Sequence, residues 1–165
     1  MRHTPRAGVL AACTLAAAIQ ALACSGAYAA EKLFSIIRMD GSAIDVTDED
    51  FEAVGITGFA TRLVGEKETV SQVRGARIDA VLDRFGIDGE NLRVTGADKY
   101  SAELPVEELR RYPVLLAYEI DGKRLTLRSK GPVWVVYPFN DYPEIADQLR
   151  EARSVWQVTT IEVQQ

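Results

Sequence analysis

The sequence predicts an α+β fold in which short helices accompany a mixed, mostly antiparallel β-sheet. Two observations lead to this prediction. Short β-branched runs recur along the chain and are separated by turn dipeptides. Apolar residues at helical spacing occur only in short segments between these runs. No repeat, low-complexity run or linker interrupts residues 30–165, so these residues are expected to form one domain.

Residues 1–29 are expected to be a secretory signal peptide that does not belong to the fold. Arg2 and Arg6 precede an apolar run over residues 9–24, and small residues at 27–29 fit a signal peptidase site. The run is shorter than a membrane span, so we expect a periplasmic protein without an integral membrane segment. The alternative is a lipoprotein, because the residues before Cys24 resemble a lipobox.

The first half of the domain is predicted to alternate strands with two short helices. One helix covers 47–55, where Thr47 is the N-cap, acidic residues occupy the first turn and Gly55 follows the end. The other covers 76–86, where apolar residues have helical spacing and Gly86 stands at the end. The predicted strands are residues 33–39, which precede an Asp-Gly turn, and residues 56–64 and 69–75.

The second half is predicted to be mostly strand. Its clearest signal lies in residues 114–128, where two apolar runs flank Asp121-Gly122, the dipeptide of a type I′ hairpin. Strands that contain the two tryptophans are predicted at 132–138 and 154–164. The remaining elements are strands at 91–96 and 100–105, a helix at 105–112 opened by Pro105 and a helix at 142–152.

Composition excludes several classes of function. Residues 30–165 carry 17 basic and 24 acidic side chains, and this net charge of −7 argues against nucleic acid and anionic membranes as partners. His3, Cys13 and Cys24 all lie in the predicted signal peptide. The domain therefore has no thiol nucleophile, histidine-based triad, zinc site or iron–sulfur cluster. We predict no catalytic residue and favour a function in binding.

The two tryptophans are the best candidates for a binding site. Trp134 shares one strand face with Val136, whereas Val133 and Val135 share the other. Trp156 lies near the start of the last predicted strand, and several arginines lie in the same stretch of the chain. Indoles beside guanidinium groups suit a flat heterocycle that forms hydrogen bonds. The alternative is that each indole is an ordinary core residue.

Five segments in order carry a resemblance to a known family. They are RGARIDAVLDRFGI, KYSAELPVEEL, YPVLLAYEIDGKRLT, RSKGPVWVVYP and SVWQVTTIEV, between about Arg74 and Val163. This region resembles the molybdopterin-binding domain of the sulfite oxidase fold. The resemblance implies that fold, a cleft for a pterin cofactor and, in the enzymes of the family, a cysteine ligand to molybdenum.

Two departures from the enzymes change what the resemblance implies. The loop that holds their cysteine corresponds to FATRLVGEKETV, residues 59–70, which has none. The enzymes also have an arginine where this chain has Trp134 and a lysine near Trp156. The chain is thus similar to small, exported, cysteine-less members that resemble periplasmic pterin-binding regulators. Those regulators dock on the periplasmic domain of a transmembrane enzyme that makes or degrades cyclic di-GMP.

The resemblance implies a pterin ligand without molybdenum and a specific set of pocket residues. Trp134 and Trp156 are expected to contact the ring, and Arg62 and Arg128 to donate hydrogen bonds to it. The full set is Thr61, Arg62, Tyr100, Arg128, Trp134, Tyr137, Arg153 and Trp156. Two alternatives remain: a molybdopterin-dependent oxidoreductase that lacks the cysteine ligand, and an interaction domain whose own tryptophans fill the pocket.

Overall fold

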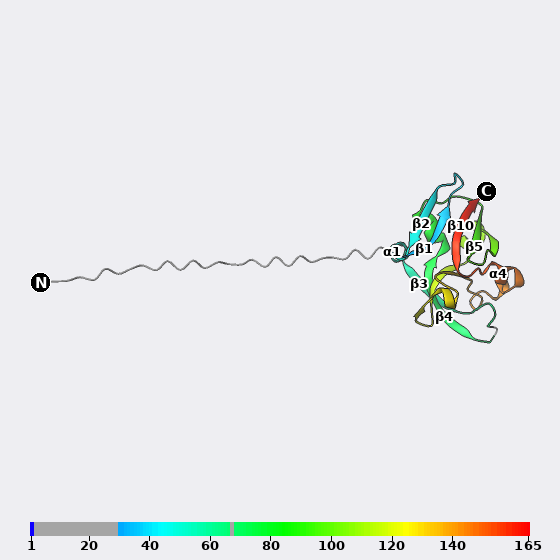
Figure 1. Ribbon diagram of the computed structural model, residues 1–165. Coiled ribbons are helices and arrows are strands. Elements are labelled where there is room, and N and C mark those ends of the chain that lie inside the picture. The colour runs from blue at the N-terminus through cyan, green and yellow to red at the C-terminus, as the bar shows by residue number, and fades with distance from the viewer. Residues whose placement is uncertain (2–29, 67) are drawn as a thin grey trace.

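The computed structural model describes Met1, residues 30–66 and residues 68–165 (Figure 1). The predicted signal peptide lies outside these residues, apart from Met1. Within the described ranges, no helix combines the length and apolar character needed to cross a membrane.

The described residues form two five-stranded sheets, whereas the sequence suggested one. The first sheet has the order β2 (Ala43–Thr47), β1 (Lys32–Ile37), β10 (Val158–Gln164), β5 (Asn91–Gly96) and β6 (Ser101–Pro105). The second has the order β3 (Ile56–Arg62), β4 (Val70–Arg77), β7 (Leu115–Ile120) and β8 (Lys123–Arg124), and β9 (Trp134–Val136) also pairs with β7. In the described pairings only β1 and β10 run parallel, which confirms a mixed, mostly antiparallel α+β fold.

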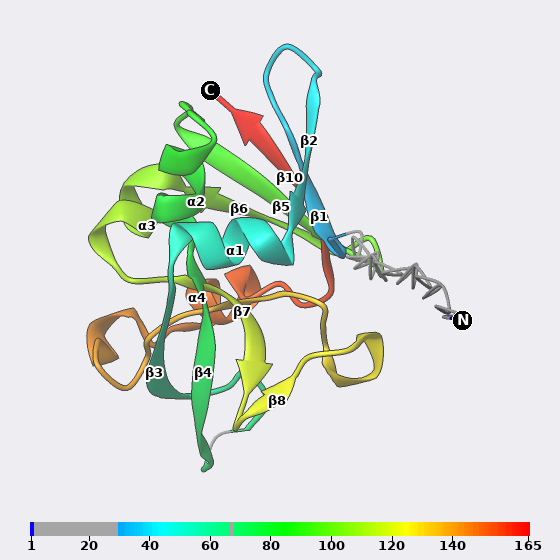
Figure 2. The ribbon, with the colours of Figure 1, turned by 90° about the vertical axis from the view of Figure 1, so that its left-hand side faces the viewer.

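Short helices connect the strands and cover the main core. They are α1 (Asp48–Val54), α2 (Ile78–Arg84), α3 (Val106–Arg111) and α4 (Gln148–Arg153), with single 3₁₀ turns η1 (Leu127–Ser129) and η2 (Pro143–Ile145). Figure 2 shows α1 crossing between the two sheets, with β3, β4, β7 and β8 below it. The start of α1 is as predicted: Thr47 and Asp50 form a reciprocal capping box.

The second sheet is buried on both faces because its inner strands alternate between two apolar clusters. In and just before β9, Val133 and Val135 pack into the main core, whereas Trp134 and Val136 pack into a smaller cluster that includes Leu63. On β7, Leu116 and Tyr118 pack into the main core, whereas Leu115 and Ala117 pack into the smaller cluster. The continuous apolar run around Trp134 is therefore buried on both faces.

Local backbone geometry corrects three expectations. The helix predicted at 142–152 is divided into η2 and α4. Asp147 between them has an extended backbone, and its side chain accepts the backbone N–H of Arg150 as the N-cap of α4. The closing strand begins at Val158 instead of Ser154, since Gln157 has a positive φ of 50° that interrupts the alternation. Strand β2 was not predicted, although the Asp40-Gly41 turn that precedes it was.

The Asp121-Gly122 hairpin forms as predicted, but its second strand is short. Asp121 and Gly122 both have positive φ, 49° and 74°, as a type I′ turn requires. Strand β8 then covers only Lys123 and Arg124, after which the chain leaves the sheet and enters η1. The hairpin and the η1 region line one of the two candidate grooves, which also contains Trp134 of β9.

Candidate functional site

Trp134 is built into the second sheet as a core residue. Its side chain is 2 % exposed, and its indole N–H donates to the carbonyl oxygen of Ser154 at 3.0 Å. The backbone of β9 extends this contact, because Val135 N–H donates to Val155 O at 2.9 Å and Val158 N–H to Val133 O at 3.0 Å. The strand and the segment after α4 are therefore held together on both sides of the indole.

Trp156 occupies the segment between α4 and β10 and is 38 % exposed. The neighbouring Gln157 fixes this segment, since its N–H donates to Lys130 O at 2.9 Å and its carbonyl accepts from Ala97 N–H at 3.0 Å. Its side chain donates to Leu127 O at 2.6 Å. The backbone is thus well anchored while one part of the indole remains accessible to solvent.

The two indoles meet edge to face, with a cation beside both. Their ring centroids are 6.4 Å apart at an interplanar angle of 89°. The Lys130 ammonium lies 4.4 Å from the Trp134 ring centroid and 5.4 Å from that of Trp156. Such contacts with the ring faces stabilise a lysine cation. Trp134 and Trp156 each line a different groove, and the two grooves differ in their chemistry.

The Trp134 groove is basic and rich in hydroxyl groups. It has a volume of about 490 Å³ and is formed by the end of β3, the β7–β8 hairpin and the η1 region. Its residues are Leu63, Glu66, Ser71, Ile120, Asp121, Lys123, Arg124, Leu125, Thr126, Arg128, Ser129, Lys130 and Trp134. Four cations against two carboxylates give it an excess of positive charge, which favours an anionic group.

The Trp156 groove is apolar and carries carboxylates. It has a volume of about 320 Å³, and its residues are Val64, Asp98, Tyr100, Glu151, Ala152, Ser154 and Trp156. Tyr100 is 48 % exposed and its hydroxyl donates to Ala152 O at 2.8 Å, which attaches the β5–β6 turn to α4. Asp98 accepts the Tyr100 N–H at 3.0 Å, so one carboxylate is held at the rim. The volumes of both grooves fall in the range of roughly 300–1,000 Å³ typical of small-molecule sites.

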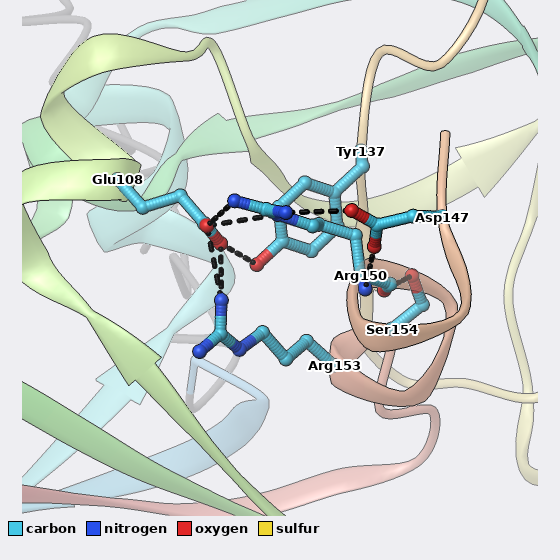
Figure 3. A network of polar contacts seen from close by, with 6 residues as sticks. All are labelled: Glu108, Tyr137, Asp147, Arg150, Arg153 and Ser154. Carbon is cyan, nitrogen blue, oxygen red and sulfur yellow. Dashed lines mark hydrogen bonds and ion pairs between the residues drawn. The ribbon is translucent and has the colours of Figure 1, made fainter. Parts of the chain in front are cut away.

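A buried ionic cluster, which we call the Glu108 network, joins α3 to α4 (Figure 3). The Glu108 side chain is only 9 % exposed and accepts from Arg150 at 2.9 Å, from Arg153 at 2.9 and 3.0 Å and from the Tyr137 hydroxyl at 2.9 Å. Asp147 also accepts from Arg150. One carboxylate on α3 thus holds two arginines of α4, the helix that leads into Trp156.

The pKa values of three groups in this network, Tyr137, Asp147 and Arg150, are shifted by their surroundings. Burial raises the pKa of Tyr137 well above its usual range, and the adjacent Glu108 carboxylate adds to the rise. The backbone N–H of Arg150 lowers the pKa of Asp147, helped by the Arg150 side chain. The hydrogen bond with Asp147 raises the pKa of Arg150. The Arg153 Nε is buried without a hydrogen-bond partner among the described residues.

The structure distributes six of the eight predicted site residues among three places. Arg128 and Trp134 line the Trp134 groove, and Tyr100 and Trp156 line the Trp156 groove. Tyr137 and Arg153 belong to the Glu108 network. Thr61 is fully buried and donates to Tyr137 O at 3.1 Å, while Arg62 lies over Phe139 and pairs with Glu151 at 3.6 Å. Thr61 and Arg62 contribute to neither groove directly.

Sequence reasoning missed the polar groups that give each groove its character. Asp98 and Glu151 line the Trp156 groove, and Lys130 contacts both indoles. Asp98 follows a predicted strand and Glu151 lies in a predicted helix, so both resembled solvated charges. Only Lys130 had a detectable signal, because it stands four residues before Trp134 at the tight turn preceding β9.

The described residues of the two grooves present aromatic surfaces and hydrogen-bonding groups. Within the described residues, no group of three or more histidine, cysteine or carboxylate side chains converges as a metal site. Residues 30–165 also supply no thiolate, and Thr61 directs its hydroxyl to a backbone carbonyl. By contrast, exposed indole and phenol surfaces beside carboxylates fit a flat ring that carries N–H donors.

Comparison with known proteins supports the fold and the family. The model of the oxidoreductase molybdopterin binding domain family matches residues 58–140, half of the chain. The matched range includes Trp134 and Arg128 but ends before Arg153 and Trp156. No curated protein matches the sequence.

Among solved structures, the chain is similar to the crystal structure of the sulfane dehydrogenase SoxCD from Paracoccus pantotrophus. The TM-score is 0.59 at 16 % identity, and the match covers 81 % of this chain and 38 % of that one. This likeness shows a sulfite-oxidase-like fold. The match thus spans well under half the length of the SoxCD chain.

Proposed function

Because the chain belongs to the oxidoreductase molybdopterin binding domain family, we propose that it is a non-catalytic pterin-binding protein whose ligand ring lies in the Trp156 groove. The observation that carries this proposal is the accessible indole of Trp156 beside Tyr100, with Asp98 and Glu151 at the same groove. Flat rings gain stacking energy from such side chains.

The carboxylates of the groove match the hydrogen-bonding edge of a pterin. A pterin carries an amino group and a ring N–H side by side, and these two donors fit the two oxygens of one carboxylate as a guanidinium does. Asp98 is held at the rim by Tyr100 N–H, and Glu151 is held by Arg62. A purely apolar planar ligand would leave these carboxylates unused, so the groove favours a ring with adjacent donors.

The basic Trp134 groove supports a place for an anionic substituent of the ligand. Arg128 and Lys130 line it, and Lys130 also contacts Trp156. A phosphate on the pterin side chain would gain charge-assisted hydrogen bonds there. A pterin without phosphate would use the Trp156 groove alone.

The proposal includes a signalling role in the periplasm. The protein reports whether its groove is occupied to the periplasmic domain of a transmembrane enzyme that makes or degrades cyclic di-GMP. The support is the similarity to exported, cysteine-less members of the family together with the absence of thiolate and imidazole from residues 30–165. Cells without the protein are expected to show a changed cyclic di-GMP level that wild-type protein restores and Trp156→Ala does not.

The binding proposal is tested by calorimetric titration with tetrahydrobiopterin as the probe. Trp156→Ala is expected to lower the affinity by about 1–3 kcal/mol, the range for loss of a central aromatic contact. Asp98→Asn keeps the acceptor for Tyr100 N–H but removes the charge, and is expected to cost about 1.5–3 kcal/mol. Leu127→Ala, which removes an exposed side chain outside both grooves, is the matched control.

Two results would contradict the proposal. One is wild-type affinity in both groove variants. The other is molybdenum bound in stoichiometric amount, with substrate turnover, in protein purified from a host that makes the molybdenum cofactor. That second result would favour the oxidoreductase alternative. Mass spectrometry of small molecules released from the purified protein identifies the natural ligand in either case.

A further inference from the structure

We propose that Glu108 is a positioning residue for the Trp156 groove, and that it controls the affinity of this groove for its ligand without touching the ligand. Glu108 stands on α3 and is not among the residues that line the groove. It acts through α4, whose arginines it binds (Figure 3). This role rests on the proposed function, because it concerns the ligand of the same groove.

Most of the Trp156 groove is formed by α4 and the segment that follows it. Four of its seven residues come from this part of the chain, namely Glu151, Ala152, Ser154 and Trp156. They include the indole that we expect to contact the ring and one of the two carboxylates at the groove. A displacement of α4 would therefore change both the shape of the groove and the position of a hydrogen-bonding group.

Apolar packing does not hold α4 in place. The helix has six residues, and none of their side chains is buried. Its leucine, Leu149, is 53 % exposed, whereas Arg150 and Arg153 are only 25 % and 15 % exposed. Because so short a helix gains little stability from its own backbone bonds, the position of α4 depends on the polar partners of these two arginines.

Glu108 is the partner that the two arginines share. Its carboxylate accepts from Arg150 Nε at 2.9 Å and from Arg153 at 2.9 and 3.0 Å. Asp147 also binds Arg150, but it is the N-cap of α4 and so does not attach the helix to another element. Among the described residues, Glu108 is the only carboxylate paired with Arg153. Loss of the Glu108 charge would leave that partly buried cation without a partner, which is costly.

The other contacts of this region lie at the C-terminal end of α4. The Ala152 carbonyl oxygen accepts the Tyr100 hydroxyl at 2.8 Å, and the Ser154 carbonyl oxygen accepts the Trp134 indole N–H at 3.0 Å. The first turn of the helix is attached to another element through the Glu108 network. Loss of the Glu108 charge is therefore expected to shift this turn while the domain stays folded.

The test measures ligand affinity and the accessibility of the indoles in folded protein. Glu108→Gln keeps the size of the side chain and an oxygen that can accept from Tyr137, but it removes the charge. In calorimetric titration with tetrahydrobiopterin, this variant is expected to bind about tenfold more weakly than wild type. Acrylamide quenching of indole fluorescence without ligand is expected to rise. The rise would report Trp156, which follows α4, since Trp134 is 2 % exposed.

A matched control separates positioning from a loss of stability. Val46→Ala leaves a cavity at a fully buried position and destabilises the domain. Val46 lies on β2, at the opposite edge of the first sheet from β6, the strand that α3 and α4 contact. Folded Val46→Ala protein is therefore expected to show the affinity and the quenching of wild type.

Two further variants keep the test independent of one substitution. Arg150→Lys keeps the charge but cannot bridge Glu108 and Asp147 as the guanidinium does, and is expected to weaken binding about threefold. It replaces Glu108→Gln if that variant does not fold. In a Trp156→Ala background, Glu108→Gln is expected to weaken binding by a smaller factor than in wild type, because both changes act on one wall of the groove.

The outcomes distinguish this role from the proposed function. Wild-type affinity and wild-type quenching in Glu108→Gln would overturn the role of Glu108 and leave the pterin proposal intact. Equal losses of affinity in Glu108→Gln and Val46→Ala would also overturn it, because the effect would then be one of stability. If wild-type protein binds no pterin, the proposed function fails and the quenching decides. Increased quenching in Glu108→Gln would then support the positioning of Trp156 by Glu108, and unchanged quenching would overturn it.

Discussion

The two tryptophans differ in how the fold holds them, although they lie edge to face. Trp134 is a strand residue that packs into the smaller apolar cluster and is 2 % exposed. Trp156 stands outside any strand and is 38 % exposed, held by the backbone bonds of its neighbour Gln157. The first indole is a core residue, whereas part of the second is open to solvent. Two identical side chains that touch each other therefore lie in different environments.

The grooves on either side of the pair differ in the same way. The Trp134 groove is basic and suits an anion, whereas the Trp156 groove is apolar with carboxylates and suits a ring with N–H donors. Lys130 contacts both indoles and is a link between the two. A ligand with a ring and an anionic tail would use both grooves, and a neutral ring would use one.

The largest expected difference lies in folding stability. Trp134→Ala should lower the free energy of unfolding by about 3–5 kcal/mol, because it leaves a cavity in the core and removes the hydrogen bond to Ser154 O. Trp156→Ala should lower it by less, about 1–2 kcal/mol, because the partly exposed indole loses mainly its edge-to-face contact with Trp134 and its contact with Lys130. Urea denaturation of both variants measures this, and equal losses would erase the distinction between the indoles.

The next effect concerns the Glu108 network, which holds α4, the helix that precedes Trp156. Glu108→Gln should lower the free energy of unfolding by about 3 kcal/mol, since it leaves the guanidinium groups of Arg150 and Arg153 without their shared charge. Asp83→Asn breaks the exposed pair with Arg110 and is the matched control, with an expected loss below about 1 kcal/mol. Equal effects of the two variants would show that α4 does not depend on Glu108.

Alkaline pH should weaken the Glu108 network, because Tyr137, whose hydroxyl donates to Glu108, then loses its proton. Because the pKa of Tyr137 is raised in the folded state, its stabilisation is complete below the ordinary tyrosine value near 10 and decreases as the pH rises above that value. The free energy of unfolding should fall by up to about 1.4 kcal/mol per pH unit there. Tyr137→Phe should show a shallower decrease, and the part that remains belongs to other tyrosines such as Tyr118.

The smallest expected effect tests the link between the indoles. Lys130→Met keeps an unbranched side chain at the same left-handed position but removes the cation, and should cost about 0.5–1 kcal/mol of stability. Lys123→Met, in the same groove but not near the indoles, should change stability by less than about 0.5 kcal/mol. Comparable losses in both would mean that the ammonium does not stabilise the pair.

Local signals predicted most of the elements correctly. The N-cap at Thr47, the type I′ hairpin at Asp121-Gly122 and the assignment of alternate residues around Trp134 to opposite strand faces all formed as expected. The break at Gln157 was not predictable in this way, because its positive φ accompanies bonds to Lys130 and Ala97 from distant parts of the chain. The location of Trp156 outside a strand follows from that break.

The sequence by itself determined the α+β class, the family and the absence of cysteine and histidine from residues 30–165, since these depend on composition and short-range pattern. Only the tertiary structure decided which tryptophan is exposed and which charges face it. Asp98, Glu151 and Lys130 come from three separate segments, and their meeting around the indoles depends on long-range strand pairing. Solvated and functional charges look alike along a chain, because what distinguishes them is the surface that the fold places beside them.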